Sequence, residues 1–241
     1  MHPGALDKLR QYDTATVCNV IDLFEVRPRN RGFMRQRVKA AFPDLPPMVG
    51  FASTVTCRTV TKPPDCQLPI VPDLISRWDE LDGPAVVVMQ NLDAHGAAAI
   101  FGDVLCHSFA AFGATGLVTD GQGRDFAGIA SLGLPVFCAG IVCAHGYMHL
   151  LTLHEAVQVG GIAVQPNTLL HGDANGVTTI PGDIAADVAD VCAEYVEAEA
   201  VVIAAAQTEA ANLAALRAAY ADMAGRIAKL NARLRKRGGS A

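Results

Sequence analysis

Residues 101–125, FGDVLCHSFAAFGATGLVTDGQGRD, decide the expected fold of this chain. The stretch opens on a Gly-Asp pair, continues through an apolar segment that predicts a helix, and then contains a short apolar run, GLVT, at 116–119. A run of this length and composition is typical of a buried strand. The glycine turn that follows ends on Arg124 and Asp125, so two charged residues stand just beyond the end of that strand.

Arg124 is isolated from the other basic residues. Between Arg77 and Arg217 it is the only lysine or arginine in the sequence. A solvated surface normally carries both signs of charge over a span of this length. A single cation beside a carboxylate, at the end of a glycine turn, therefore indicates a functional site.

The rest of the chain alternates predicted strands and helices. Apolar or β-branched runs predict strands at 49–61, 85–90, 116–119 and 135–142, and helices are expected at 4–25, 74–81, 103–112 and 125–132. Thr14 or Thr16 is a candidate cap for a second segment within the first helix. Runs at 156–164, 168–171 and 177–180 predict further strands, with hairpin-forming residues at 173–176. This alternation predicts an α/β domain with a mixed or parallel sheet.

The composition changes at residue 183. From there the chain is rich in alanine and other helix formers, so we expect a domain at 1–182 and a C-terminal helical extension at 183–241. Apolar residues in the extension repeat at alternating steps of three and four: Leu213, Leu216, Tyr220, Met223, Ile227, Leu230 and Leu234. This heptad pattern predicts either an interface between subunits or an amphipathic helix packed on its own domain, and the sequence favours neither.

The overall composition is that of a globular protein. Of the 241 residues, 51% are hydrophobic and 18% are charged, and the formal net charge is −5. Basic residues gather at 27–39 and 229–237, which we interpret as solvated faces that pair with acidic surfaces; we do not expect nucleic-acid binding. No apolar run is long enough to span a membrane, and the first residues do not resemble a signal peptide. Seven cysteines without a paired CxxC spacing favour a reducing cytoplasm over a disulfide framework.

The residues of the opening stretch suit a small anionic ligand. Asp125 offers hard oxygen ligands, and Mg²⁺ in proteins commonly takes only one or two carboxylates. Arg124 offers a planar guanidinium that suits a carboxylate or a developing enolate oxygen. Asp103 begins a predicted helix, whose first N–H groups attract anions. Taken singly, each residue is also explained by a helix cap or an ion pair, but the solitary cation favours a site for a dicarboxylate or a 2-oxo acid.

Three other chemistries find less support. A Schiff-base aldolase needs a lysine in a buried strand, and the lysines of this sequence lie elsewhere. The HGYMH segment at 145–149 lacks the glutamate of a zinc-binding HExxH helix. The GQG segment at 121–123 follows a strand, but Phe126 replaces the third glycine of a GxGxxG loop, which argues against a dinucleotide or methyl-donor site.

Residues 101–140 resemble the RraA-like family, which includes the 4-hydroxy-4-methyl-2-oxoglutarate aldolases. The resemblance rests on Asp103, then a gap of twenty residues, then Arg124-Asp125 within GLVTDGQGRD, followed by LGLPVFCAG. It extends to about residues 5–181 through TATVCNVID, FPDLPPMVGFASTVTC and VQVGGIAVQPNTLLHGDANGV. The chain departs from the family pattern at Gly123, where a small aliphatic residue is usual, at residues 166–168, and in its longer heptad helix.

The resemblance implies a fold, an assembly and residue roles. The fold is a layered αββ sandwich of the swivelling-domain type, here with a long C-terminal helix, and the assembly is a trimer or hexamer. Asp125 would hold Mg²⁺ or Mn²⁺, Asp103 would position a metal-bound water, and Arg124 would bind the substrate and stabilise a pyruvate enolate. The backbone of four residues would hold a substrate carboxylate: Gly102, Asp103, Val104 and Leu105.

The implied activity is that of a divalent-metal-dependent lyase. It would release pyruvate from a 4-hydroxy-2-oxo dicarboxylic acid, with oxaloacetate decarboxylation as a side activity through the same enolate. The alternative is a non-catalytic regulator, because members of the family also bind and inhibit a ribonuclease. The sequence does not rank the substrates, and it does not identify which glutamate a neighbouring subunit contributes.

Overall fold

The computed structural model describes residues 3–35, 37–93, 97–208 and 212–238. Its centre is a mixed sheet in the order β1-β7-β5-β3-β2-β11-β12, with β8 also paired to β2. These strands are β1 (Lys39–Ala40), β2 (Met48–Arg58), β3 (Ala85–Asn91), β5 (Gly116–Thr119), β7 (Val136–Cys138), β8 (His149–Leu153), β11 (Leu169–Asp173) and β12 (Gly176–Ile180). Two further pairs are β4 (Ala99–Phe101) with β6 (Gln122–Gly123), and β9 (Val157–Val159) with β10 (Ile162–Val164).

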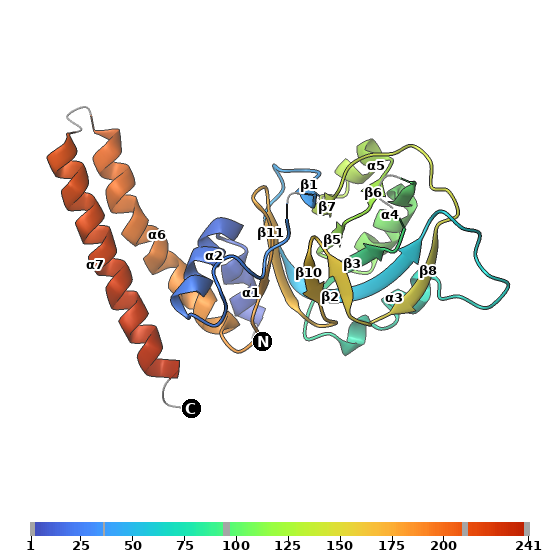
Figure 1. The fold of residues 1–241 in the computed structure, drawn as a ribbon, viewed down its shortest axis with the longest axis horizontal. Helices are drawn as coiled ribbons and strands as arrows, with labels where there is room; N and C mark the ends of the chain where they lie inside the picture. The colour runs from blue at the N-terminus through green and yellow to red at the C-terminus, as the bar shows by residue number, and fades with distance from the viewer. Residues whose placement is uncertain (1–2, 36, 94–96, 209–211, 239–241) are drawn as a thin grey trace.

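Helices lie on both sides of this sheet (Figure 1). They are α1 (Pro3–Leu9), α2 (Thr14–Leu23), α3 (Val71–Ile75), a 3₁₀ turn η1 (Trp78–Glu80), α4 (Asp103–Ala111), α5 (Phe126–Ala130), α6 (Ala185–Gln207) and α7 (Leu213–Gly238). Helices α4 and α5 lie beside the parallel strands, whereas α1, α2 and α6 lie at the opposite end, near β11. The predicted class, a layered α/β fold with a long C-terminal helix, is confirmed.

The parallel strands form the most deeply buried part of the sheet. Strand β2 pairs in parallel with β3, β3 with β5, and β5 with β7. Ten of the eleven residues of β2 are buried, because helices or loops cover both of its faces. The strand predicted at 116–119 has those bounds, and the hairpin predicted around 173–176 is formed by β11 and β12.

Several predicted element bounds were too long. The first helix is divided, because the Asp13 side chain accepts a hydrogen bond from the Thr16 backbone N at 2.6 Å and caps α2. The helix predicted at 74–81 is the short α3 followed by η1. The strand predicted at 135–142 ends at Cys138, since Gly140 has a positive φ of 142° that an extended strand does not accommodate.

Three apolar clusters hold the layers together. One lies between α1, α2, α6 and the strands β2, β11 and β12. The second packs α3, α4 and α5 on the parallel strands, and in it Cys106, Phe109 and Ile129 are completely or almost completely buried. The third covers other sheet residues with the β9–β10 pair and the segment around Met34. The second cluster matters for function, because it fixes the helices that follow β4 and β6.

Helices α6 and α7 form a hairpin that extends away from the sheet (Figure 1). At its base, Leu230 and Leu234 of α7 are buried in the same cluster as α1 and α2. Near its tip, Leu213 is 74% exposed and Tyr220 is 53% exposed. The side chains from residue 235 onward, in the predicted basic cluster, lie outside those that are described. Among the described residues, no helix combines the length and the apolar character needed to cross a bilayer.

Candidate functional site

A short parallel ladder brings the two ends of the opening stretch together. Phe101 of β4 lies opposite Gly123 of β6, and the Arg124 backbone N donates to the Phe101 carbonyl at 3.1 Å. Each strand is followed directly by a polar pair, Gly102-Asp103 after β4 and Arg124-Asp125 after β6. Parallel pairing puts the ends of both strands at the same edge. Two pairs that are twenty residues apart in sequence therefore become neighbours.

The close approach of β4 and β6 depends on Gly123. A Cβ atom at this position would lie 2.1 Å from Cζ of Phe101, far inside van der Waals contact. The Phe101 ring is itself buried and packs against Phe126, with ring centroids 6.0 Å apart. The departure from the family pattern at Gly123 is thus matched by the large ring of Phe101 on the neighbouring strand.

Asp125 adopts an unusual backbone conformation. Its φ of 60° and ψ of 32° lie in the left-handed region, which aspartate tolerates better than most residues that carry a side chain. Strain of this kind concentrates at functional sites. The Asp125 Oδ2 lies 3.2 Å from Nε of Arg124, and both side chains remain partly exposed, at 36% for Arg124 and 41% for Asp125. The pair is therefore accessible to a ligand.

The Arg124-Asp125 pair lies directly over the start of α4. A Cβ atom on Gly102 would be 2.8 Å from Asp125 Oδ2 and 3.3 Å from Arg124 Cγ. Only glycine leaves room for these side chains to touch the backbone at this position. The Asp103 carboxylate accepts from Val104 N at 2.8 Å within the first turn of α4, and a Cβ atom on Gly128 of α5 would lie 3.3 Å from Cβ of Asp103.

A cavity of about 240 Å³ opens beside these residues. Its lining includes the whole predicted substrate-binding set: Gly102, Asp103, Val104, Leu105 and Arg124. Asp125, the predicted metal ligand, is outside that lining but contacts Arg124 at its edge. The volume suits a small molecule, since it lies just below the usual range for drug-sized ligands.

Two residues that line this cavity, His145 and Met148, were not predicted from the sequence. The turn that carries them is tied to distant strands: Ala99 N donates to the Ala144 carbonyl at 2.7 Å, and Tyr147 N donates to the Thr59 carbonyl at 2.8 Å. These tertiary contacts, which no local pattern indicates, bring His145 into the same cavity lining as the start of α4.

The available ligands fit a hard cation better than a soft one. Within the part of the chain that the structure describes, no group of three or more histidine, cysteine, aspartate or glutamate side chains could hold a metal by itself. The oxygen donors near the cavity are the carboxylates of Asp103 and Asp125. Mg²⁺ binds one or two carboxylates and keeps several waters, whereas zinc sites need more nitrogen or sulfur ligands.

A serine–histidine–glutamate arrangement lies elsewhere in the fold. Ser53 Oγ is 3.1 Å from Nε2 of His154, whose Nδ1 is 3.1 Å from Oε2 of Glu80. Ser53 is completely buried and also accepts from Trp78 Nε1 at 2.9 Å, so a substrate has no access to it. This arrangement has a structural role next to α4, because the Trp78 ring packs on Phe109 of that helix.

The cysteine closest to the site is equally inaccessible to substrate. Cys106 lies on α4, one turn beyond the start of the helix, and is completely buried. Burial, with a smaller effect of the Asp103 charge, raises the pKa of its thiol to about 12. A thiol with this pKa carries almost no thiolate at neutral pH and is a poor nucleophile.

The chain is similar to known proteins in sequence and in fold. A family model described as RraA-like, aldolase/RraA, matches residues 14–179. A curated protein of Halalkalibacterium halodurans, named "Putative 4-hydroxy-4-methyl-2-oxoglutarate aldolase", is 34% identical over 99 residues, which are 41% of this chain and 47% of that protein. The chain spans less than half the length of the curated relatives that it matches.

Two solved structures share the fold. An uncharacterized protein from Pseudomonas syringae pv. tomato has a TM-score of 0.69 at 23% identity, over 90% of this chain and 98% of that one. Streptomyces coelicolor RraAS2, described as an unusual member of the RNase ES inhibitor RraA protein family, has a TM-score of 0.66 at 23% identity, over 82% of this chain and 96% of that one. At these identities the likeness concerns the fold alone.

Proposed function

Since this chain belongs to the RraA-like family, whose model matches residues 14–179, we propose that it is a lyase that cleaves 4-hydroxy-2-oxo dicarboxylic acids and releases pyruvate. The observation that carries the proposal is the cavity beside β4 and β6. The first turn of α4 and the solitary cation, Arg124, both line this cavity, and the Asp125 carboxylate lies at its edge.

The start of α4 supplies the binding site for a carboxylate. Gly102 precedes the helix, and the first N–H groups of α4 point toward its N-terminal end, where the helix dipole attracts an anion. Val104 and Leu105 border the same cavity. A 2-oxo acid bound by its carboxylate here would present its 2-oxo oxygen to the Arg124 side of the cavity.

Arg124 supplies positive charge where negative charge develops. Cleavage between C3 and C4 removes the proton of the C4 hydroxyl and moves an electron pair onto the 2-oxo oxygen. A guanidinium that faces this oxygen stabilises the enolate more than the neutral ketone, so the barrier falls. Asp103, in the same cavity, would hold the water that accepts and returns the proton.

We further propose that Asp125 helps to hold Mg²⁺ or Mn²⁺. When bound, such an ion acts as a Lewis acid on the 2-oxo acid. The partly exposed carboxylate of Asp125 has the hard oxygen atoms that these ions prefer, and its position beside Arg124 would place the ion near the substrate oxygen.

The decisive experiment measures pyruvate release by the purified chain. The substrates are 4-hydroxy-4-methyl-2-oxoglutarate, 4-carboxy-4-hydroxy-2-oxoadipate and oxaloacetate, each tested with Mg²⁺, with Mn²⁺ and with a chelator. We expect turnover that the chelator abolishes and that added metal restores. If none of the three substrates shows metal-dependent turnover, the lyase is excluded.

We also propose that the chain assembles as a homotrimer or homohexamer, which light scattering on the same sample would test.

One observation favours a different function, that of a non-catalytic regulator that binds another protein. The tip of the α6–α7 hairpin exposes apolar side chains, among them Ile203 and Leu213, at 55% and 74%. Such residues can form a contact with a partner. A regulator would show no turnover in the assay above and would keep its partner affinity after Arg124→Ala.

A further inference from the structure

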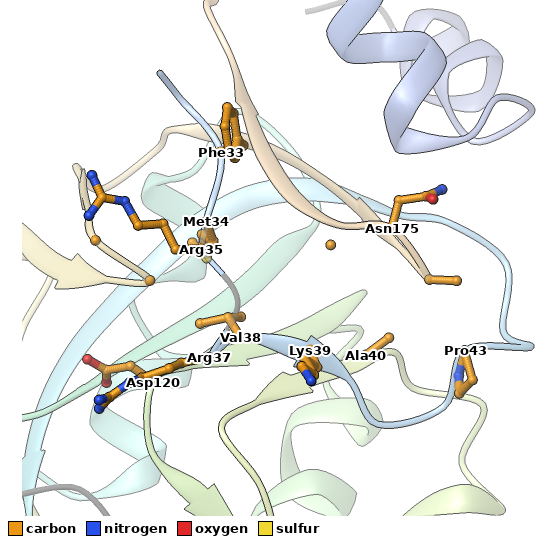
Figure 2. Close-up of a pocket in the computed structure, with 14 residues that line it drawn as sticks. Phe33, Met34, Arg35, Arg37, Val38, Lys39, Ala40, Pro43, Asp120 and Asn175 are labelled. Carbon is orange, nitrogen blue, oxygen red and sulfur yellow. The ribbon is translucent and has the colours of Figure 1, made fainter. Parts of the chain in front are cut away.

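A pocket that is larger than the cavity at α4 lies apart from the candidate site. Its volume is about 1140 Å³, and it is formed by the segment 33–43, Asp120 and the turns of two hairpins, at 160–161 and 174–176. Figure 2 shows these turns and the segment surrounding a common space. None of its lining residues lines the cavity at α4, so a ligand here would be a second ligand.

Positive charge dominates this pocket, although the whole chain has a net charge of −5. Arg35, Arg37 and Lys39 line it, and all three are exposed. Of the described residues that line the pocket, Asp120 is the single acidic one. Among the described residues, neither Arg35 nor Lys39 forms an ion pair. A concave surface lined by one sign of charge concentrates ligands of the opposite sign.

The backbone that carries these cations is anchored on both sides. Met34 N donates to the Val177 carbonyl at 2.8 Å, and Arg35 N donates to the Gly160 carbonyl at 2.8 Å, so the segment is tied to both hairpins. Val38 N donates back to the Arg35 carbonyl at 3.0 Å, which closes a turn. Main-chain hydrogen bonds thus hold Met34, Arg35 and Val38 in place before any ligand binds.

Burial also alternates along the segment. Met34 and Val38 are 7% and 4% exposed and belong to the third apolar cluster, whereas the three cations between and beyond them point outward. A Cβ atom on Gly161 would lie 3.2 Å from Cδ of Arg35, so the hairpin turn limits where the Arg35 stem can go. The exposed cations of the pocket therefore lie on a segment whose apolar side chains, Met34 and Val38, are packed in the core.

The three cations are spread over the pocket. In Figure 2, Arg37 and Asp120 lie at one end, Lys39 lies nearer the middle, and Asn175 stands on the facing hairpin. Phe33, which is 41% exposed, and Pro43 add apolar surface to the same lining. A ligand that matches this arrangement carries more than one anionic group on an organic framework.

We propose that this pocket binds a small organic polyanion, with at least two phosphate or carboxylate groups. Guanidinium groups bind both kinds of oxyanion through paired hydrogen bonds, and an ammonium group adds a point charge. The proposal is independent of the lyase activity, because it uses none of the residues assigned to the reaction. Its ligand class follows from the number and spread of the cations together with the apolar rim.

Calorimetric titration of the full chain tests the proposal with two probes, inorganic tripolyphosphate and citrate. We expect at least one probe to bind saturably, with one site per chain and with an affinity that falls as salt rises. Stronger binding of tripolyphosphate would identify a phosphorylated ligand, and stronger binding of citrate a polycarboxylate. The double variant Arg37→Gln/Lys39→Gln should weaken the better probe by about tenfold or more, roughly 1.4 kcal/mol.

A matched control removes the same number of charges next to the pocket. Arg29 and Arg31 belong to the same basic cluster but do not line the pocket, so Arg29→Gln/Arg31→Gln should leave the affinity within about twofold. Circular dichroism would verify that both variants remain folded, and Arg35→Gln provides an additional pocket variant.

Four results would overturn the proposal. The first is that neither probe binds saturably, and the second is that both double variants weaken binding equally, which would indicate diffuse charge. The third is that Arg124→Gln abolishes probe binding, which would assign the binding site to the cavity at α4. The fourth is that single-stranded RNA displaces the probes and binds more tightly through the same residues.

Discussion

Arg124 and Asp125 are adjacent in the chain, and the backbone between them decides how their side chains meet. The left-handed conformation of Asp125 turns its carboxylate back toward Nε of Arg124 and over the backbone of Gly102. An ordinary helical conformation at Asp125 would direct its carboxylate elsewhere. Both charges therefore face the space at the start of α4 because of one strained residue.

The first prediction concerns Arg124 itself. In the Arg124→Ala variant we expect kcat for pyruvate release to fall by about 10²–10³-fold or more, since the variant lacks the positive charge that we propose to face the enolate oxygen. The partly exposed side chain contributes little to folding, so the thermal midpoint should change little. Steady-state kinetics and thermal unfolding measure the two effects. Arg217→Ala, at an exposed position on α7, is the control, and a normal kcat in Arg124→Ala would remove this residue from the reaction.

The second prediction concerns the contact between Gly123 and Phe101. Gly123→Ala should lower the free energy of unfolding by about 1–3 kcal/mol, because the added methyl group meets the buried ring. It should also reduce kcat, since β6 positions Arg124. Gly225→Ala is the matched control: nothing lies within 4 Å of its added Cβ in α7, so about 0.5–1 kcal/mol of stabilisation is expected. Chemical denaturation measures the free energy of unfolding of both variants. Equal changes in the two variants would show that the Phe101 ring moves to accommodate the added methyl group.

At the scale of secondary-structure elements, a buried histidine joins the N-terminal helices to the sheet. His171 of β11 is completely buried, with Nδ1 2.9 Å from the Thr14 hydroxyl and Nε2 3.0 Å from the Leu9 carbonyl. The carbonyl can only accept, so Nε2 carries the proton and Nδ1 accepts from Thr14. His171 thus bridges the end of α1 and the start of α2.

This bridge predicts an acid-sensitive stability. Burial lowers the pKa of His171 below its ordinary value of about 6.5. The unfolded chain then takes up a proton at a higher pH than the folded chain. The contribution of His171 is therefore complete above about pH 6.5 and is lost as the pH falls from there through the lower folded pKa.

Urea denaturation at pH 7.5 and at successively lower pH would measure this loss. We expect His171→Gln to flatten the decline, because glutamine can replace the hydrogen bonds without titrating. His149→Gln, on the more exposed β8, should leave the decline as it is in the parent chain. A parent-like decline in His171→Gln would assign the acid sensitivity to other groups.

At the scale of the whole molecule, the heptad seam of α7 is covered along only part of its length. Near the base, Ile227 packs on the first apolar cluster, and Leu230 and Leu234 are buried in it. Near the tip, Leu213 and Tyr220 occupy the same heptad position as Ile227 but are largely exposed. The base of α7 thus packs on its own domain, as one alternative of the sequence prediction has it, whereas an interface between subunits at the exposed tip stays a prediction.

We expect the double variant Leu213→Glu/Tyr220→Glu to lower the oligomer mass in light scattering, since two buried charges would disfavour a helical interface at the tip. Ala218→Glu/Ala221→Glu adds the same charge to the same helix outside the seam and serves as the control. An unchanged subunit count in the first variant would assign α7 wholly to its own domain.

Local sequence patterns predicted the elements whose burial dominates their structure. The apolar run at 116–119 is β5, and the helix expected from Asp103 is α4, because buried strands and amphipathic helices leave a clear periodicity. Bounds that depend on a single contact were missed. The cap from Asp13 and the turn at Gly140 leave almost no pattern, so the first helix and the strand at 135–142 were predicted too long.

The sequence by itself determined the family of this protein and the residues that we propose for its chemistry: a solitary arginine next to an aspartate, and a helix start twenty residues earlier, at the spacing of the RraA-like family. Tertiary structure decided which groups meet. The β4–β6 ladder joins the two halves of the candidate site, and the turn at 144–148 adds His145 to its cavity. The turns of two hairpins form the second pocket together with the basic segment. The physical reason is that these contacts join segments far apart in the chain, and local periodicity carries no information about which distant segment a surface will pack against.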